Sequence, residues 1–252
     1  MSDLSASAPD GNLDVTPTPA KPASRWEDFI DIFYAPSSVY ARREHSGFGI
    51  PMLVVTVLIG VIALANSGVM QPIMDAEFAR QTAAMMKKNP QITPEMMEKG
   101  RAFGETIAKI GAFVFIPIAM FLTGLVLWLV GKFFDAKQTL AAAIMVAAYA
   151  YVPRILESIL AGVQGLLMDP ASLDGRYRLS LGAGRFLDPN TASPMMLALL
   201  GRVDVFTIWV TVLLAIGLAV TGKIPRSKAA LAALIVWILG ALPAVLGAAR
   251  AA

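Results

Sequence analysis

The sequence predicts an all-α fold: a polytopic membrane bundle of about five transmembrane helices that follows a disordered N-terminal tail. Composition is the first observation, because 56% of the 252 residues are hydrophobic and only 15% are charged. A soluble domain averages about 45–50% apolar and about 25% charged residues. The second observation is that the apolar residues form long uncharged runs, each close to the roughly 20 residues that cross a hydrocarbon core.

Residues 1–24 are predicted to be a disordered cytoplasmic tail. They are rich in Pro, Ala, Ser and Thr, and contain Pro9, Pro17, Pro19 and Pro22. Such a stretch cannot bury enough apolar area to offset the entropy lost on ordering. It also lacks the basic region and the apolar run of a secretory signal peptide.

Residues 25–45 are predicted to form an amphipathic helix before the membrane. Its apolar residues recur at helical spacing, namely Trp26, Phe29, Ile30 and Phe33. The opposite face is acidic, with Glu27, Asp28 and Asp31, and Pro36 ends or kinks the helix. Two placements remain open: against the cytoplasmic ends of the bundle, or flat in the membrane surface.

Residues 46–252 are predicted to be a membrane domain with five spans. The spans are expected at about 50–70, 107–131, 139–168, 203–222 and 229–249. Any one of these runs could be a buried helix of a soluble protein, but five of them favour a membrane bundle. Only the third contains charges in its interior, Arg154 and Glu157.

The orientation follows from the basic residues in the short connections. Five spans place three basic segments on one side: Arg42 and Arg43, then Lys132 and Lys137, then Lys223, Arg226 and Lys228. Positive residues favour the cytoplasmic side. We therefore expect a cytoplasmic N-terminus and, in a bacterial inner membrane, a periplasmic C-terminus.

The long connection at 71–106 is predicted to be helical. Thr93-Pro94-Glu95 has the pattern of an N-cap followed by a first-turn proline and acid, so a helix could run from there into the second span. At 1.5 Å per residue the two arms would project roughly 20 Å beyond the bilayer. The alternative is that the segment folds back as a cap on the bundle.

A polar site is predicted in the third span, directly after Pro153. Arg154 and Glu157 lie three residues apart near its middle, so they share a helix face and can pair. Tyr151, Ser158 and Gln164 recur on nearly the same face. A lone charge at the bilayer centre costs at least about 2.5–3.5 kcal/mol, so this face must meet the bundle, a partner or water. The site is either a conduction, binding or switching site, or a structural ion pair.

Catalytic chemistry is not predicted. The chain has one histidine and no cysteine, and it shows no Ser-His-Asp set, His-Glu-x-x-His motif or Gly-rich phosphate loop. We expect no catalytic, cofactor or metal site, and the lone His45 is expected to be an interfacial polar residue. Lys and Arg are scattered rather than clustered, which argues against nucleic acid as a partner.

Three segments together resemble the Yip family, five-span membrane proteins named for their interaction with Ypt/Rab GTPases, and more narrowly its bacterial members. They read DIFYAPSSVY at 31–40, YAYVP at 149–153 and DVFTIW at 204–209. The family-like positions within them are Tyr34, Pro36, Tyr149, Asp204 and Trp209. The resemblance extends over about residues 25–249.

The resemblance implies a cytoplasmic N-terminus, an external C-terminus and no enzymatic activity. Binding of Rab GTPases is not carried over, because the segment before the first span lacks the Asp-Leu-Tyr-Gly-Pro form. Some bacterial relatives accompany ABC-type exporters as accessory subunits. The expected function is therefore a non-catalytic scaffold or accessory subunit, with membrane lipids and other membrane proteins, such as an ABC permease or a periplasmic adaptor, as partners. The alternative is a transporter or channel that uses Tyr151, Arg154, Glu157 and Gln164.

Overall fold

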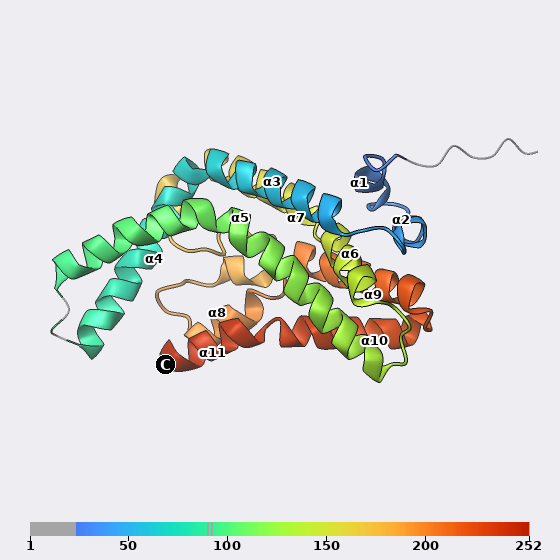
Figure 1. Ribbon diagram of the computed structural model, residues 1–252. Helices are drawn as coiled ribbons and strands as arrows, with labels where there is room; N and C mark the ends of the chain where they lie inside the picture. Colours follow the sequence, from blue (N-terminus) through green and yellow to red (C-terminus); the bar gives the residue numbers. More distant parts are fainter. Residues whose placement is uncertain (1–23, 90, 92, 252) are drawn as a thin grey trace, which may run out of the picture.

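The structure is a computed structural model that describes residues 24–89, 91 and 93–251, so the predicted tail lies outside it except for Ser24. The described chain is helical, with one isolated antiparallel bridge between Gly182 and Asp204 and no named strand. The all-α fold class is confirmed (Figure 1). In order, the α-helices are α1 (Asp28–Asp31), α2 (Pro36–Arg43), α3 (Gly49–Ala65), α4 (Ser67–Lys88), α5 (Pro94–Phe133), α6 (Leu140–Ala150), α7 (Pro153–Leu167), α8 (Pro194–Leu200), α9 (Val205–Gly222), α10 (Arg226–Leu239) and α11 (Leu242–Ala251).

Four helical stretches of the described chain are long and apolar enough to cross a membrane. They are Ile110–Phe133, Leu140–Leu167, Val205–Gly222 and Arg226–Arg250. A fifth crossing exists if α3 and α4 count as one span, although they are bent by 75° relative to each other. The predicted straight span at 50–70 is thus interrupted at Asn66, where α3 ends.

Three connections meet at one end of the bundle, which we call the basic end (residues 44–48, 132–139 and 223–228). The backbone N–H of Lys137 donates to the carbonyl of Gly222 over 2.9 Å. The Lys223 ammonium lies 2.6 Å from the Glu44 carboxylate. Helices α5 and α9 end at these connections, whereas α3, α6 and α10 begin there. Successive helices therefore run in opposite directions, as expected for five crossings.

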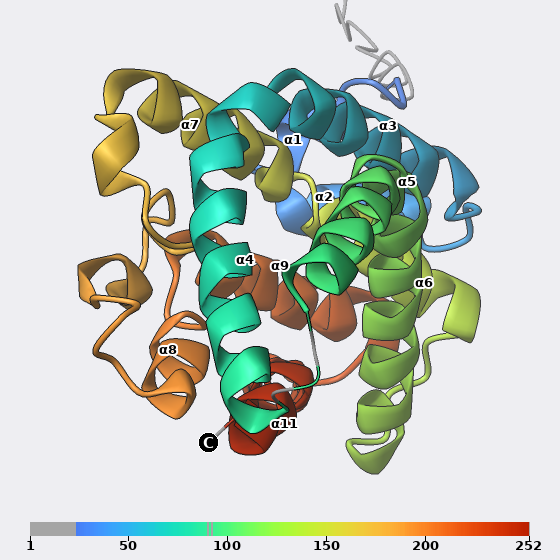
Figure 2. The same cartoon turned by 90° about the vertical axis from the view of Figure 1, so that its left-hand side faces the viewer.

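The opposite end, which we call the loop end, gathers α4, the 168–204 segment and α11. Arg80 of α4 donates to the Asn190 side chain over 3.4 Å, and Lys88 donates to the carbonyl of Arg250 over 3.4 Å. Figure 2 shows α4 crossing this end from α7 towards α11. Helix α4 therefore folds back over the bundle.

The first turns of α5 extend away from the bundle beyond its apolar stretch. The helix begins where the cap was expected, since Thr93 Oγ1 accepts the Met96 N–H over 3.3 Å. It then continues unbroken to Phe133. A salt bridge of 2.5 Å from Arg101 to Asp75 joins these turns to α4. We call α4 and the first turns of α5, residues 67–109, the arm; it lies on the left in Figure 1.

Helix α6 is the centre of the bundle, and every residue from 142 to 150 is buried. Its many alanines allow neighbouring helices to approach closely. A Cβ on Gly124 of α5 would lie 2.5 Å from Cα of Ile144, and a Cβ on Gly217 of α9 would overlap Val146. Two glycines thus bring α5 and α9 against α6.

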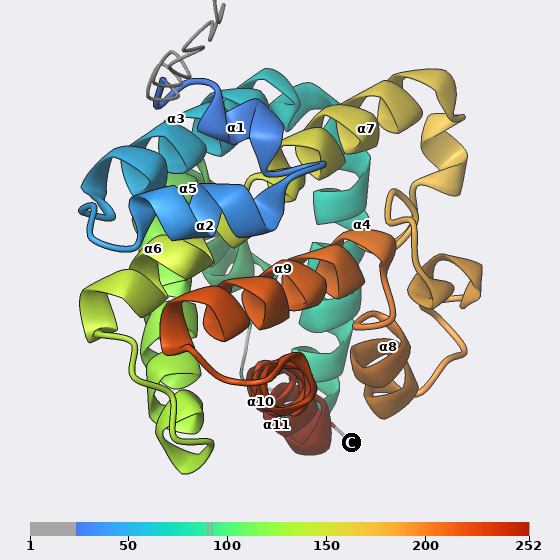
Figure 3. The same cartoon turned by 90° about the vertical axis from the view of Figure 1, so that its right-hand side faces the viewer.

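The predicted helix at 25–45 is two helices separated by a turn before Pro36. Helix α2 lies lengthwise beside α9, and both run towards the basic end (Figure 3). The rings of Phe33 and Trp209 are 5.5 Å apart at one end of this contact, and Glu44 pairs with Lys223 at the other. The segment therefore covers the side of α9.

The assignment of Asp28 to the polar face was wrong, because its side chain is completely buried. Trp26 and Ile30, assigned to the apolar face, are exposed. The physical reason is that α1 has only one turn. A single turn followed by a change of direction does not present one continuous apolar stripe.

Candidate functional site

The third span is broken at its proline, and the break sets the position of the polar site. Helix α6 ends at Ala150 and α7 begins at Pro153, which has no N–H to donate. The next two N–H groups bond three residues back: Arg154 to Tyr151 over 2.9 Å and Ile155 to Val152 over 3.0 Å. This tighter turn directs the following side chains between α3, α5 and α9.

Arg154 joins α7 to α9. Its Nη1 lies 2.6 Å from Glu157 Oε2, and its Nη2 donates to Thr207 Oγ1 over 3.0 Å. The two charged side chains are about equally exposed, at 28% and 27%. Because Thr207 belongs to α9, the guanidinium fixes the position of one span relative to another.

The remaining polar residues of this span also have partners. The Tyr151 hydroxyl lies 3.1 Å from Thr123 Oγ1 of α5, and Ser158 Oγ donates to the Arg154 carbonyl over 2.9 Å. Gln164 points elsewhere, since its Nε2 donates to the Leu179 carbonyl over 3.1 Å. The stripe is therefore a series of separate contacts.

A cavity of about 300 Å³ lies beside the ion pair. Its polar lining consists of Tyr151, Arg154, Glu157 and Ser158, and its apolar lining comes from α3 and α5. Gln164 is not part of this lining. The structure thus brings four of the five predicted polar residues around one cavity and leaves Gln164 outside it.

A second polar cluster surrounds Asp28, which is 0% exposed. Its carboxylate accepts from Arg42 Nε over 2.7 Å, from Arg43 Nε over 2.5 Å and from the Tyr149 hydroxyl over 3.2 Å. Two cations and a phenol stabilise one buried charge, as a buried carboxylate requires. The cluster attaches α1 and α2 to α6.

Sequence reasoning missed this cluster. Arg42 and Arg43 were interpreted only as topology signals, and Asp28 as a solvated acid. No periodicity could have shown that they meet, because Tyr149 lies 121 residues from Asp28. The only available signal was that Asp28 precedes Pro36 and that Arg42 and Arg43 follow it.

Tyr34 and Pro36 form the turn between α1 and α2. Pro36 is the first residue of α2, and Tyr34 is exposed with its hydroxyl 2.5 Å from Asp31 Oδ1. This hydrogen bond, together with one from Arg42, holds the pKa of Asp31 below its usual value. The same bond raises the pKa of Tyr34.

The two family-like residues of α9 have structural contacts. Asp204 is buried, and its Oδ1 accepts the N–H groups of Phe206 and Thr207 over 2.9 and 3.3 Å, so it caps the helix. The Trp209 ring packs on Phe33 and on Phe206. Tyr149 and Trp209 therefore hold the N-terminal helices on the bundle. In the described part of the chain no group of three or more His, Cys, Asp or Glu could hold a metal ion.

The apolar spans and the paired charge inside one of them define a class: this is a multi-pass α-helical membrane protein. Within that class, the Yip1 domain matches residues 30–247, from α1 into α11, and the chain belongs to the Yip1 domain family. This is a family of membrane proteins and not a known enzyme family. No curated protein and no solved structure shows a significant match.

Proposed function

We propose that the chain is a non-catalytic scaffold or accessory subunit of a bacterial inner-membrane assembly, with an ABC-type exporter as the candidate assembly. Its N-terminus lies in the cytoplasm and its C-terminus in the periplasm. It docks other membrane proteins, such as an ABC permease or a periplasmic adaptor, and carries out no chemistry of its own.

The observation that supports docking is the surface of the arm. Met96 is 60% exposed and Phe103 is 72% exposed, although both precede the apolar stretch that begins at Ile110. Met85 and Met86 of α4 are exposed as well. Apolar side chains that water would otherwise surround favour a protein partner. Methionine in particular adapts to varied partner surfaces.

The paired charges support a structural role for the intramembrane site. Arg154 is hydrogen-bonded to Glu157 and Thr207, so it has a function in holding α7 and α9 together without any transported ligand. A paired arginine of this kind meets the requirement that an intramembrane charge be compensated.

Purification from the native membrane in nanodiscs, followed by mass spectrometry, tests the proposal. The wild-type chain is expected to retain a membrane-protein companion in stoichiometric amount. The double substitution Met96→Gln and Phe103→Gln should reduce that companion. Phe133→Gln should not, because Phe133 is 86% exposed at the other end of the same helix. A chain that emerges alone, or only with copies of itself, contradicts the proposal.

The alternative function is a transporter or channel, and the cavity beside Arg154 and Glu157 is the observation that favours it. Flux through the purified chain in proteoliposomes distinguishes the two functions. Flux that disappears in Arg154→Ala and Glu157→Ala supports the alternative. Absence of flux supports the scaffold.

A further inference from the structure

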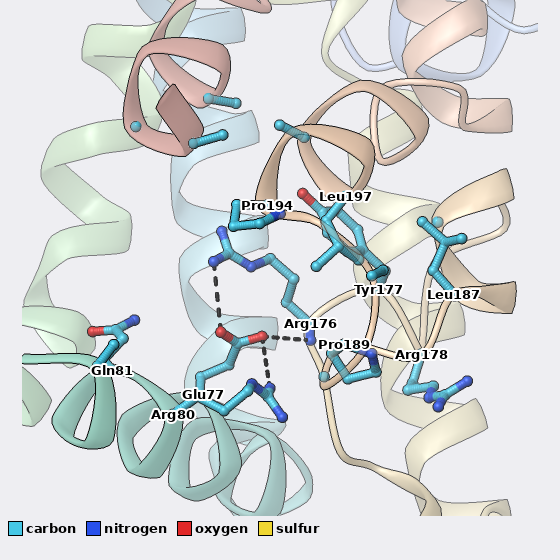
Figure 4. A pocket seen from close by; sticks show the side chains of 18 of the residues that line it. Glu77, Arg80, Gln81, Arg176, Tyr177, Arg178, Leu187, Pro189, Pro194 and Leu197 are labelled. Carbon is cyan, nitrogen blue, oxygen red and sulfur yellow. Dashed lines mark hydrogen bonds and ion pairs between the residues drawn. The ribbon is translucent and has the colours of Figure 1, made fainter. Parts of the chain in front are cut away.

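A cavity of about 490 Å³ lies at the loop end. It is lined by residues of α4, of the chain from Gly175 to Ala198 and of α11 (Figure 4). This volume lies within the usual range of small-molecule sites. Nothing in the proposed scaffold role requires such a cavity.

One wall of the cavity is charged. Figure 4 shows Glu77 between Arg80 and Arg176. The Glu77 carboxylate lies 3.1 Å from Arg80 Nη2 and 3.6 Å from Arg176 Nη2, and it accepts the backbone N–H of Arg176 over 3.3 Å. Arg80 Nη2 is buried, and its neighbour is the Glu77 carboxylate at 3.1 Å. Arg176 is the exposed arginine of this wall, so its guanidinium can also reach a ligand.

Arg178 completes this wall and is fixed in place. Asp174 accepts from its Nε over 2.6 Å and from its Nη2 over 3.1 Å, and the Arg185 carbonyl accepts from its Nη1 over 3.0 Å. The Arg178 guanidinium holds the pKa of Asp174 below its usual value, so this carboxylate stays charged at neutral pH. Three arginines against two carboxylates leave one positive charge, which a phosphodiester would balance.

The other wall is apolar and comes from α8 and α11. Its residues include Pro194, Leu197, Pro243, Ala244 and Gly247. A Cβ on Gly247 would meet nothing within 4 Å, so the space beside α11 is open. Large apolar side chains are also exposed at the end of α7 and in the 168–204 segment, at Leu166, Leu167 and Phe186. Exposed residues of this kind suit contact with acyl chains.

We propose that this cavity binds one anionic phospholipid. The phosphodiester would lie against the exposed Arg176 guanidinium, beside its pair with Glu77, and the first part of an acyl chain would lie along α8 and α11. The cationic wall also suits an acidic peptide. The adjoining apolar wall, in a chain that is embedded in a membrane, favours a lipid.

Native mass spectrometry of the full chain tests the proposal. The purified protein is stripped of lipid and then given phosphatidylglycerol and phosphatidylcholine in equal amounts. One phosphatidylglycerol should be retained in clear preference. Arg176→Gln should reduce its retention about tenfold, the scale of one charge-assisted hydrogen bond. Arg176 is 63% exposed, so the fold does not depend on it. Arg185→Gln is the matched control, because Arg185 lies at the same end but does not line the cavity, and it should leave retention unchanged.

A second variant tests the apolar wall and separates a lipid from a water-soluble phosphate. Gly247→Leu should fill the space beside α11 and reduce phosphatidylglycerol retention, while glycerol phosphate should still bind. Unchanged lipid retention in Gly247→Leu, together with displacement by glycerol phosphate, contradicts a lipid ligand. Equal retention of the two lipids, or equal losses in Arg176→Gln and Arg185→Gln, also overturns the proposal. If the cavity retains an acidic peptide that phosphatidylglycerol does not displace, the cavity is assigned to a peptide.

Discussion

Polar side chains inside the spans act as connections between helices. Arg154 uses one terminal nitrogen for Glu157 within α7 and the other for Thr207 in α9. Tyr151 reaches α5 through Thr123. If one partner of such a contact is removed, the other is left as an unpaired polar group in an apolar surrounding. This costs more stability than the removal of both partners.

The Arg154 pair gives the first prediction. Arg154→Ala and Glu157→Ala should each lower the stability of the detergent-solubilised protein by about 2–3 kcal/mol, because each leaves the other charge uncompensated. The double variant should lose less than either single variant. Thermal unfolding of the three variants in one detergent measures this. Losses that simply add in the double variant would rule out coupling between the two residues.

The buried carboxylate gives the second prediction. Asp28→Asn should destabilise the protein by about 3 kcal/mol, because Arg42 and Arg43 lose the buried carboxylate that they share. It should also release α1 and α2 from α6, so that a protease cleaves after Arg42 or Arg43 sooner than in the wild type. Glu27→Gln is the control, since the neighbouring Glu27 is exposed. Similar cleavage rates in the two variants would show that the cluster does not hold the segment.

At the scale of elements, α6 is held between α5 and α9 by close contacts of small residues. The third prediction is that Gly124→Ala destabilises the protein by about 1–3 kcal/mol, because its Cβ would overlap the backbone of Ile144. Gly49→Ala is the matched control, as a Cβ there meets nothing within 4 Å. The two midpoints of thermal unfolding give the comparison, and equal values would contradict close packing at Gly124.

The helices that could be predicted are those with a strong local signal. Uncharged runs predicted the four long apolar stretches, and the Thr93-Pro94 pattern predicted the start of α5. The bend after α3 was missed because Asn66, Ser67 and Gly68 carry no charge, so the run appeared continuous. Asn66 has a tertiary contact there, its Nδ2 donating to the Ser158 carbonyl over 2.9 Å.

The same distinction holds for the sites. Arg154 and Glu157 are three residues apart on one helix, so their proximity follows from helix geometry. The cavity at the loop end combines Glu77, Arg176 and Gly247 from three distant segments. Its existence depends on how α4 turns back over the bundle, which no local pattern in this chain specifies.

At the scale of the whole molecule, the chain has two chemically different ends. Two of the three connections of the basic end contain Lys132, Lys137, Lys223, Arg226 and Lys228. The arm, the 168–204 segment and the C-terminal helix meet at the loop end. If the basic end faces the cytoplasm, as we propose from the positive-inside tendency, both the docking surface of the arm and the proposed lipid cavity would face the periplasmic side.

All of these assignments depend on the bent pair of α3 and α4 forming a true crossing, and cysteine accessibility tests that crossing most directly. The chain has no cysteine, so Gly47→Cys, Gln91→Cys and Ser227→Cys each introduce a unique thiol at an exposed position. A membrane-impermeant maleimide applied to spheroplasts should label Gln91→Cys. It should label Gly47→Cys and Ser227→Cys only after the membrane is permeabilised. Labelling of Gly47→Cys and Gln91→Cys from the same side would mean that α3 does not cross, which would contradict the five-span account.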